Sequence, residues 1–205
     1  MNHKFESWRG KAWVRSWKNL SAASAGLAMR RGPSGKRRRA ERERGNGVSN
    51  GAITDTLRRL KAAVGDKMIL AAGKMHASGI PSEAGEHIVT ARDVEEFIGA
   101  GADIVLFPAP GTVPGITMEY VRSLVKEAHS RGVLTMTSIG TSQEGADTET
   151  IRQIALMCKM AGTDIHHLGD SGYTGMALPE NILAYSKAIR GARHAYRRMA
   201  YSVNR

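Results

Sequence analysis

The sequence predicts an α/β fold in which parallel strands alternate with outer helices. Four apolar segments, at residues 68–72, 104–107, 133–138 and 163–168, each run into small and polar residues, and a helical pattern follows each of them. The spacing from Ile69 to Ile104 is 35 residues, from Val105 to Leu134 it is 29, and from Leu134 to Ile165 it is 31. These distances are typical of βαβ units. Because a complete TIM (β/α)8 barrel needs eight strands, we expect the C-terminal portion of such a barrel.

Apolar residues recur at helical spacing in six segments, which predicts helices over 52–64, 91–99, 118–130, 148–161, 180–190 and 192–203. Ser49 or Asn50, Thr90 and Thr117 stand where a side chain can cap a helix N-terminus. Gly162 stands where the fourth helix should end. Local residue chemistry therefore predicts where these helices begin and end.

The charge divides the chain into two expected parts, an extension over residues 1–45 and a partial barrel over residues 46–205. The extension holds 13 Lys/Arg against 3 Asp/Glu, whereas the remainder holds 17 against 16. A basic segment with few aliphatic residues is expected to have little order. Two other interpretations stay open. Its basic and tryptophan side chains could bind nucleic acid, or the segment is foreign to the domain, from a truncated or out-of-frame start.

The composition also bears on the cellular compartment. No apolar run approaches the roughly 18 residues that a membrane-spanning helix needs. Cys158 is the single cysteine of the chain, so no disulfide can form within it. We expect a cytoplasmic protein.

Polar residues at the carboxyl ends of the predicted strands are the candidate site, since these ends meet at one rim of a barrel. A lysine there can pair with an anionic oxygen or form a Schiff base, and a histidine can transfer protons. His166 and His167 are adjacent and must point to opposite faces of their strand, and we expect His166 to enter the site. The catalytic candidates are Lys74, His76, His166 and Asp170.

Two glycine-rich loops offer backbone amides and hydroxyls that could hold phosphate. The anion-binding candidates are Gly140, Thr141, Ser142, Gly169, Ser171, Gly172, Tyr173 and Gly175. Glu144 and Asp170 are candidate ligands for a divalent cation such as Mg²⁺. The expected partners are a small anionic metabolite and further copies of the chain, rather than a membrane or nucleic acid.

The segments GVSNGAIT (47–54), AAGKMHASG (71–79), LFPAPGTVPGIT (106–117) and SIGTSQEGADTETIRQIALMCKMAGTDIHHLGDSGYTG (138–175) resemble a poorly characterised bacterial TIM-barrel family. That family is often labelled phosphoenolpyruvate phosphonomutase-like or haloacid dehalogenase-like hydrolase. The resemblance covers about residues 46–205 and implies a barrel with a site on its rim, the amino-terminal strands being absent. The chain lacks the DxDx(T/V) motif of haloacid dehalogenases.

Three functional hypotheses remain open at this point. The first is a lyase- or mutase-like barrel enzyme that acts on a small phosphorylated or carboxylated metabolite. The second is an inactive barrel fragment that self-associates through its exposed sheet edges. The third is nucleic-acid binding through residues 1–45.

Overall fold

A four-stranded parallel sheet organises the part of the chain that the computed structural model describes, residues 50–74, 85–140, 142–169 and 177–201. Its strands are β1 (Ala71–Gly73), β2 (Ile104–Pro108), β3 (Leu134–Ser138) and β4 (Ile165–His167). They pair in the order β1-β2-β3-β4, so every strand lies beside its neighbour in the sequence.

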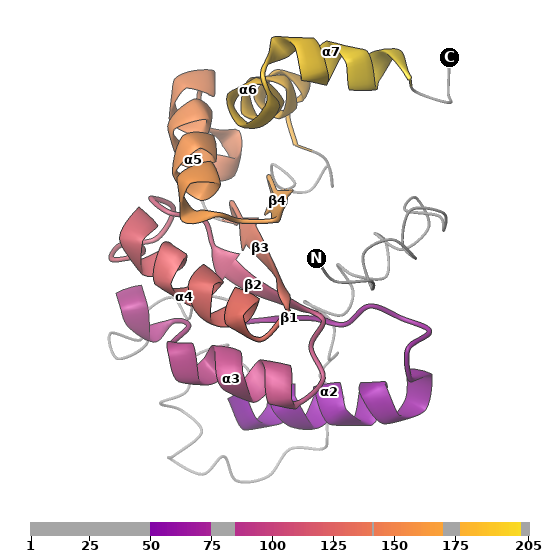
Figure 1. Ribbon diagram of the computed structural model, residues 1–205. Coiled ribbons are helices and arrows are strands. Elements are labelled where there is room, and N and C mark those ends of the chain that lie inside the picture. The colour runs from indigo at the N-terminus through magenta and orange to yellow at the C-terminus, as the bar shows by residue number, and fades with distance from the viewer. Residues whose placement is uncertain (1–49, 75–84, 141, 170–176, 202–205) are drawn as a thin grey trace, which may run out of the picture. The chain divides into compact units, whose positions relative to one another are not determined.

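Helices connect and cover these strands. They are α2 (Asn50–Val64), α3 (Ala91–Gly99), α4 (Met118–Ser130), α5 (Thr148–Ala161), α6 (Pro179–Arg190) and α7 (Ala192–Ala200), with short 3₁₀ helices η4 (Gly85–His87) and η5 (Ser142–Gly145). Figure 1 shows the connecting helices α3, α4 and α5 along the same side of the sheet. Sequential strand order with the crossover helices on one face is the winding of a barrel, and it confirms the predicted fold class.

The two faces of the sheet differ in burial. Val105 and Phe107 are fully buried and belong to the apolar core formed with α3 and α4. Thr135 pairs with Val105 and Thr137 with Phe107, and both threonines are also buried. Because side chains alternate along a strand, Leu106 and Ser138 point to the opposite face, which would be the interior of a barrel.

The helix ends follow the local signals in the sequence. Thr90 accepts a hydrogen bond from the Asp93 backbone and Asp93 bonds back to Thr90, which makes a capping box at α3. Thr117 caps α4 in the predicted way, and Gly162 ends α5 in the left-handed conformation. These three predictions are confirmed. Asp147, which caps α5 through the backbone N–H groups of Glu149 and Thr150, was not predicted.

A repeated Gly-x-Asp-Ile sequence, at residues 101–104 and 162–165, joins each strand start to the preceding strand. Asp103 Oδ2 accepts the backbone N–H of Leu70 at 2.9 Å. Asp164 Oδ2 accepts the backbone N–H and the hydroxyl of Thr135, both at 2.8 Å, and lies 2.7 Å from His129 Nε2. Both aspartates therefore fix strand register at the amino-terminal end of the strands, the end of a barrel that contributes to stability rather than to catalysis.

The outer strands are shorter than the sequence indicates. β1 begins at Ala71 rather than residue 68, and β4 covers Ile165–His167 rather than 163–168. The side chain of Asp164 accepts a hydrogen bond from the backbone N–H of Thr135. The backbone pairing between β3 and β4 therefore begins at Met136 and Ile165. In the described part of the chain, no helix is long and apolar enough to cross a membrane.

Candidate functional site

Ser138 and His167 meet at the carboxyl ends of β3 and β4, where they are register partners. His167 Nδ1 lies 3.2 Å from Ser138 Oγ and accepts the backbone N–H of Gly169 at 3.0 Å. A backbone N–H can only donate, so Nδ1 carries no proton in this arrangement and the neutral ring holds its proton on Nε2. Backbone geometry thus sets the tautomer of His167.

Glu144 joins this group from η5. Gly169 has a φ of +78°, and a Cβ built on it would overlap both Glu144 Cγ and the Ile139 carbonyl oxygen. No side chain fits there without displacing the backbone, so the Glu144 side chain packs directly against the start of the glycine-rich loop. The group of Ser138, Glu144, His167 and Gly169 is called the rim cluster below.

Lys74 is one of the two catalytic candidates that lie within the described residues, the second being His166. It directly follows β1. β1 and β4 are the two outer strands of the sheet, separated by three interstrand spacings. Gly73 is in register with Leu106, Met136 and Ile165, so Lys74 falls in the next row, with Phe107, Thr137 and His166, and about 14 Å from β4 at about 4.8 Å per spacing. The described strands therefore do not bring Lys74 into the rim cluster.

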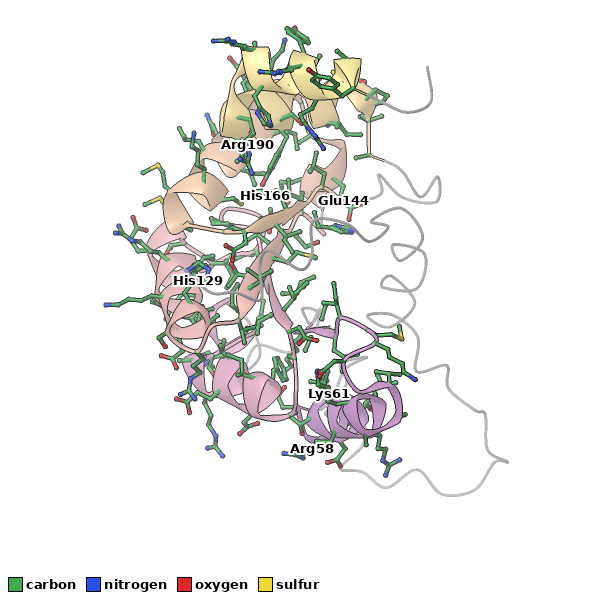
Figure 2. All side chains as sticks on the ribbon, turned by 45° about the vertical axis from the view of Figure 1, so that its right-hand side comes forward. Arg58, Lys61, His129, Glu144, His166 and Arg190 are labelled. Carbon is green, nitrogen blue, oxygen red and sulfur yellow. The ribbon has the colours of Figure 1, made fainter. Side chains whose placement is uncertain are left out.

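His166 lies on the opposite face from His167, within the helix layer. Its Nδ1 atom is 2.9 Å from the Tyr185 hydroxyl of α6. Burial, with a smaller contribution from the Arg190 charge, lowers the pKa of His166, and burial raises the pKa of Tyr185. In Figure 2, His166 and Arg190 lie close together where β4 meets α6.

The prediction that the two histidines take opposite faces is therefore confirmed, but the geometry favours His167 over His166 as the rim histidine. The sequence held one relevant signal. Leu168 packs in the apolar cluster beside α5 and α6, and alternation places His166 on the same face as Leu168. Ile165 is equally apolar and shares the face of His167. The alternation of apolar residues therefore did not decide which histidine faces the helices.

Only some of the anion-binding candidates lie within the described residues. Gly140 lies beside Ser138, since a Cβ built on it would be 3.7 Å from Ser138 Oγ, and the backbone of Ser142 begins η5. Thr141, Ser171, Gly172, Tyr173 and Gly175 lie outside the described residues, as do His76 and Asp170. Their roles stay predictions.

The metal prediction paired Glu144 with Asp170. Among the described residues there is no group of three or more His, Cys, Asp or Glu side chains that could hold a metal ion. Asp170 lies outside those residues. A cation such as Mg²⁺ stays a prediction, and no chemical step below depends on it.

Comparison with known proteins gives one curated relative. It is the "Putative N-acetylmannosamine-6-phosphate 2-epimerase" of Haemophilus influenzae, 35% identical over 89 residues, which are 43% of this chain and 33% of the relative. The matched part of this chain thus spans about a third of the length of that relative.

Two solved structures are similar at low identity. Deoxyribose phosphate aldolase from Aeropyrum pernix, described as a tetramer, has a TM-score of 0.48 at 15% identity and covers 69% of this chain and 67% of its own. QR15, an aldolase, has a TM-score of 0.48 at 12% identity, with 70% and 72% covered. None of these three relatives carries a phosphonomutase or haloacid dehalogenase name. A family model matches residues 43–205, and the chain belongs to that family, described as Domain of unknown function (DUF7916).

Proposed function

We propose that this chain supplies the active-site rim of a TIM-barrel enzyme that acts on a small phosphorylated or carboxylated metabolite. The observation that carries the proposal is the rim cluster, in which a histidine of fixed tautomer, a hydroxyl, a carboxylate and a glycine-rich loop start meet. They meet at the carboxyl ends of parallel strands, which is where barrel enzymes hold their substrates.

The substrate class follows from the loop and from the curated relative. The segment GDSGYTG at residues 169–175 offers consecutive backbone amides ahead of α6, a sequence suited to phosphate. The name of the relative describes a sugar phosphate. We therefore expect the metabolite to carry a phosphate or carboxylate that this loop binds.

The reaction class we propose is proton transfer at a carbon of that metabolite. The curated relative is named a 2-epimerase, and inverting a carbon by acid–base chemistry needs one group to remove a proton and one to return it. His167 holds a proton on Nε2 and Glu144 supplies a carboxylate from the neighbouring loop. Carbon–carbon lyase reactions also use acid–base groups, so a lyase stays within the proposed class.

Thermal melting of the full chain with inorganic phosphate and with phosphoenolpyruvate tests the proposal. A saturable rise in melting temperature is expected, because a ligand that binds the native state stabilises it. His167→Gln should weaken the effect, whereas Lys159→Met, which removes an exposed lysine near the end of α5, should leave it unchanged. No anion effect in the wild-type chain, or equal effects in all variants, would contradict the proposal.

Two alternatives remain beside this one. Nucleic-acid binding through residues 1–45 involves a segment outside the described residues, and it predicts binding that weakens steeply with salt. Self-association through the sheet edges does involve described residues. It predicts a melting temperature that rises with protein concentration and does not respond to anions.

A further inference from the structure

An apolar groove of about 520 Å³ lies between α6 and α7, on the face of β4 that His166 shares and the rim cluster does not. Its apolar lining includes Leu168, Ile182, Ile189 and Met199. The volume falls within the range of about 300–1,000 Å³ that is typical of small-molecule sites. The groove is therefore large enough to hold a small ligand at a place distinct from the rim.

The groove extends from the helix surface down to the sheet. Ile182 and Met199 at its opening are 41% and 61% exposed, whereas Tyr185, which also lines it, is only 3% exposed. His166 of β4 lies at the same depth, because its Nδ1 atom is 2.9 Å from the Tyr185 hydroxyl. A narrow apolar chain can enter a groove of this depth, whereas a partner helix about 10 Å across would rest on its opening.

The charge of the groove is positive. Arg190, His194 and Arg198 line it, and none of the described residues that line it carries a carboxylate. Residues 181–201 hold five Lys/Arg and no Asp/Glu. Within the described part of the chain, neither Arg190 nor Arg198 forms an ion pair. A ligand with an anionic group would supply the opposite charge that these two guanidinium groups lack.

His166 adds a hydrogen-bond donor to the floor of the groove. Burial raises the pKa of Tyr185, so its hydroxyl keeps its proton and donates it to Nδ1 of His166. The neutral ring then holds its own proton on Nε2, and that N–H has no acceptor among the described residues. Arg190 lies close to His166 (Figure 2). An anionic oxygen between them could accept from both.

We propose that this groove binds an amphiphilic carboxylate, a fatty-acid-like anion with its head group at Arg190 and His166 and its apolar chain between Ile182 and Met199. Residues 1–45 are basic, and so is the α7 helix of any second copy, so charge complementarity favours an anion over either as the occupant. The inference does not depend on the proposed function, because His166 and His167 face opposite sides of the sheet.

Isothermal titration calorimetry of the full chain with sodium octanoate tests the proposal. We expect saturable one-to-one binding, at least tenfold tighter than that of acetate, which lacks the chain, or of octan-1-ol, which lacks the charge. Arg190→Gln should weaken octanoate binding about tenfold, whereas Arg193→Gln, an exposed arginine of α7 outside the groove, should not change it. No saturable binding to the wild type, or equal effects of the two variants, would overturn the proposal.

A second pair of variants tests where the apolar chain lies. Ile182→Asp should weaken octanoate binding at least tenfold, and Leu156→Asp should not, because Leu156 is 51% exposed on α5 and lies outside the groove. Absent binding together with a changed sedimentation coefficient of Ile182→Asp would instead assign the groove to a contact between copies and overturn the proposal.

Nuclear magnetic resonance tests where the head group lies. The ring resonances of His166, identified by their loss in His166→Gln, should shift when octanoate is added and stay unchanged with inorganic phosphate. Unshifted His166 resonances at saturating octanoate would overturn the placement of the carboxylate. The phosphate titration belongs to the rim, so its failure and a failure of octanoate binding are distinguishable.

Discussion

The Nδ1 atom of His166 lies 2.9 Å from the hydroxyl oxygen of Tyr185, and this contact joins β4 to α6 inside the helix layer. Burial raises the pKa of Tyr185, so the phenol keeps its proton. Burial also lowers the pKa of His166, so its ring is neutral. The phenol therefore donates and the imidazole accepts, a pairing that holds only while His166 stays unprotonated.

This pairing predicts a pH dependence of stability. The pKa of His166 is lower in the folded chain than the ordinary value of 6.5, so below about pH 6.5 the unfolded chain binds more protons. The free energy of unfolding should fall as the pH drops from neutral through this range, until His166 protonates in the folded chain as well. Urea unfolding at fixed protein concentration should show this loss in the wild type and a smaller one in His166→Gln. His194→Gln changes an exposed side chain of α7 and should show the same dependence of unfolding free energy on pH as the wild type.

Replacing Asp164 by Ala should destabilise the fold by about 1–3 kcal/mol, because it removes the carboxylate oxygen that accepts both the backbone N–H and the hydroxyl of Thr135. Asp66→Ala is the control, since the Asp66 side chain is almost fully exposed, and it should change stability by less than about 0.5 kcal/mol. Urea unfolding of the two variants measures the difference. Equal stability would show that Asp164 does not hold β3 and β4 in register.

Gly169→Ala should cost more than Gly65→Ala although both glycines have positive φ. Gly65 has open space around its Cβ position, so alanine there meets only the backbone strain of about 1–2 kcal/mol. At Gly169 the added methyl also overlaps the Ile139 carbonyl and the Glu144 side chain, which should add at least about 1 kcal/mol. Chemical denaturation measures both changes. A Gly169→Ala variant as stable as Gly65→Ala would contradict the packing of Glu144 against this loop.

Glu144→Gln should tighten phosphate binding about fivefold, because a carboxylate near the loop repels an anion by about 1 kcal/mol at 4 Å even in water. The anion titration described for the proposed function measures it. Glu149→Gln removes an exposed charge from the first turn of α5 and should leave the affinity unchanged. Weaker binding in Glu144→Gln would instead mean that Glu144 holds the ligand through a proton or a cation.

The sequence predicted most of the local structure because its determinants are local. The bounds of α3, α4 and α5 agree with the predicted ranges, since Thr90, Thr117 and Gly162 act within one turn of the helix they limit. The strand spacing likewise predicted the parallel α/β fold, because the length of a crossover connection is a property of the chain itself.

The tertiary structure decided what depends on a neighbour. The bounds of β1 and β4 depend on which backbone groups form hydrogen bonds with the adjacent strand and which with the Asp164 side chain. The choice between His166 and His167 depends on which face of the sheet the helices cover, and residues 165–168 carry apolar side chains on both faces. The sequence by itself determined the elements and the rim on which a site would lie. Only packing placed Ser138, His167, Gly169 and Glu144 together, because contacts between residues about 30 positions apart are set by the assembled sheet rather than by either segment alone.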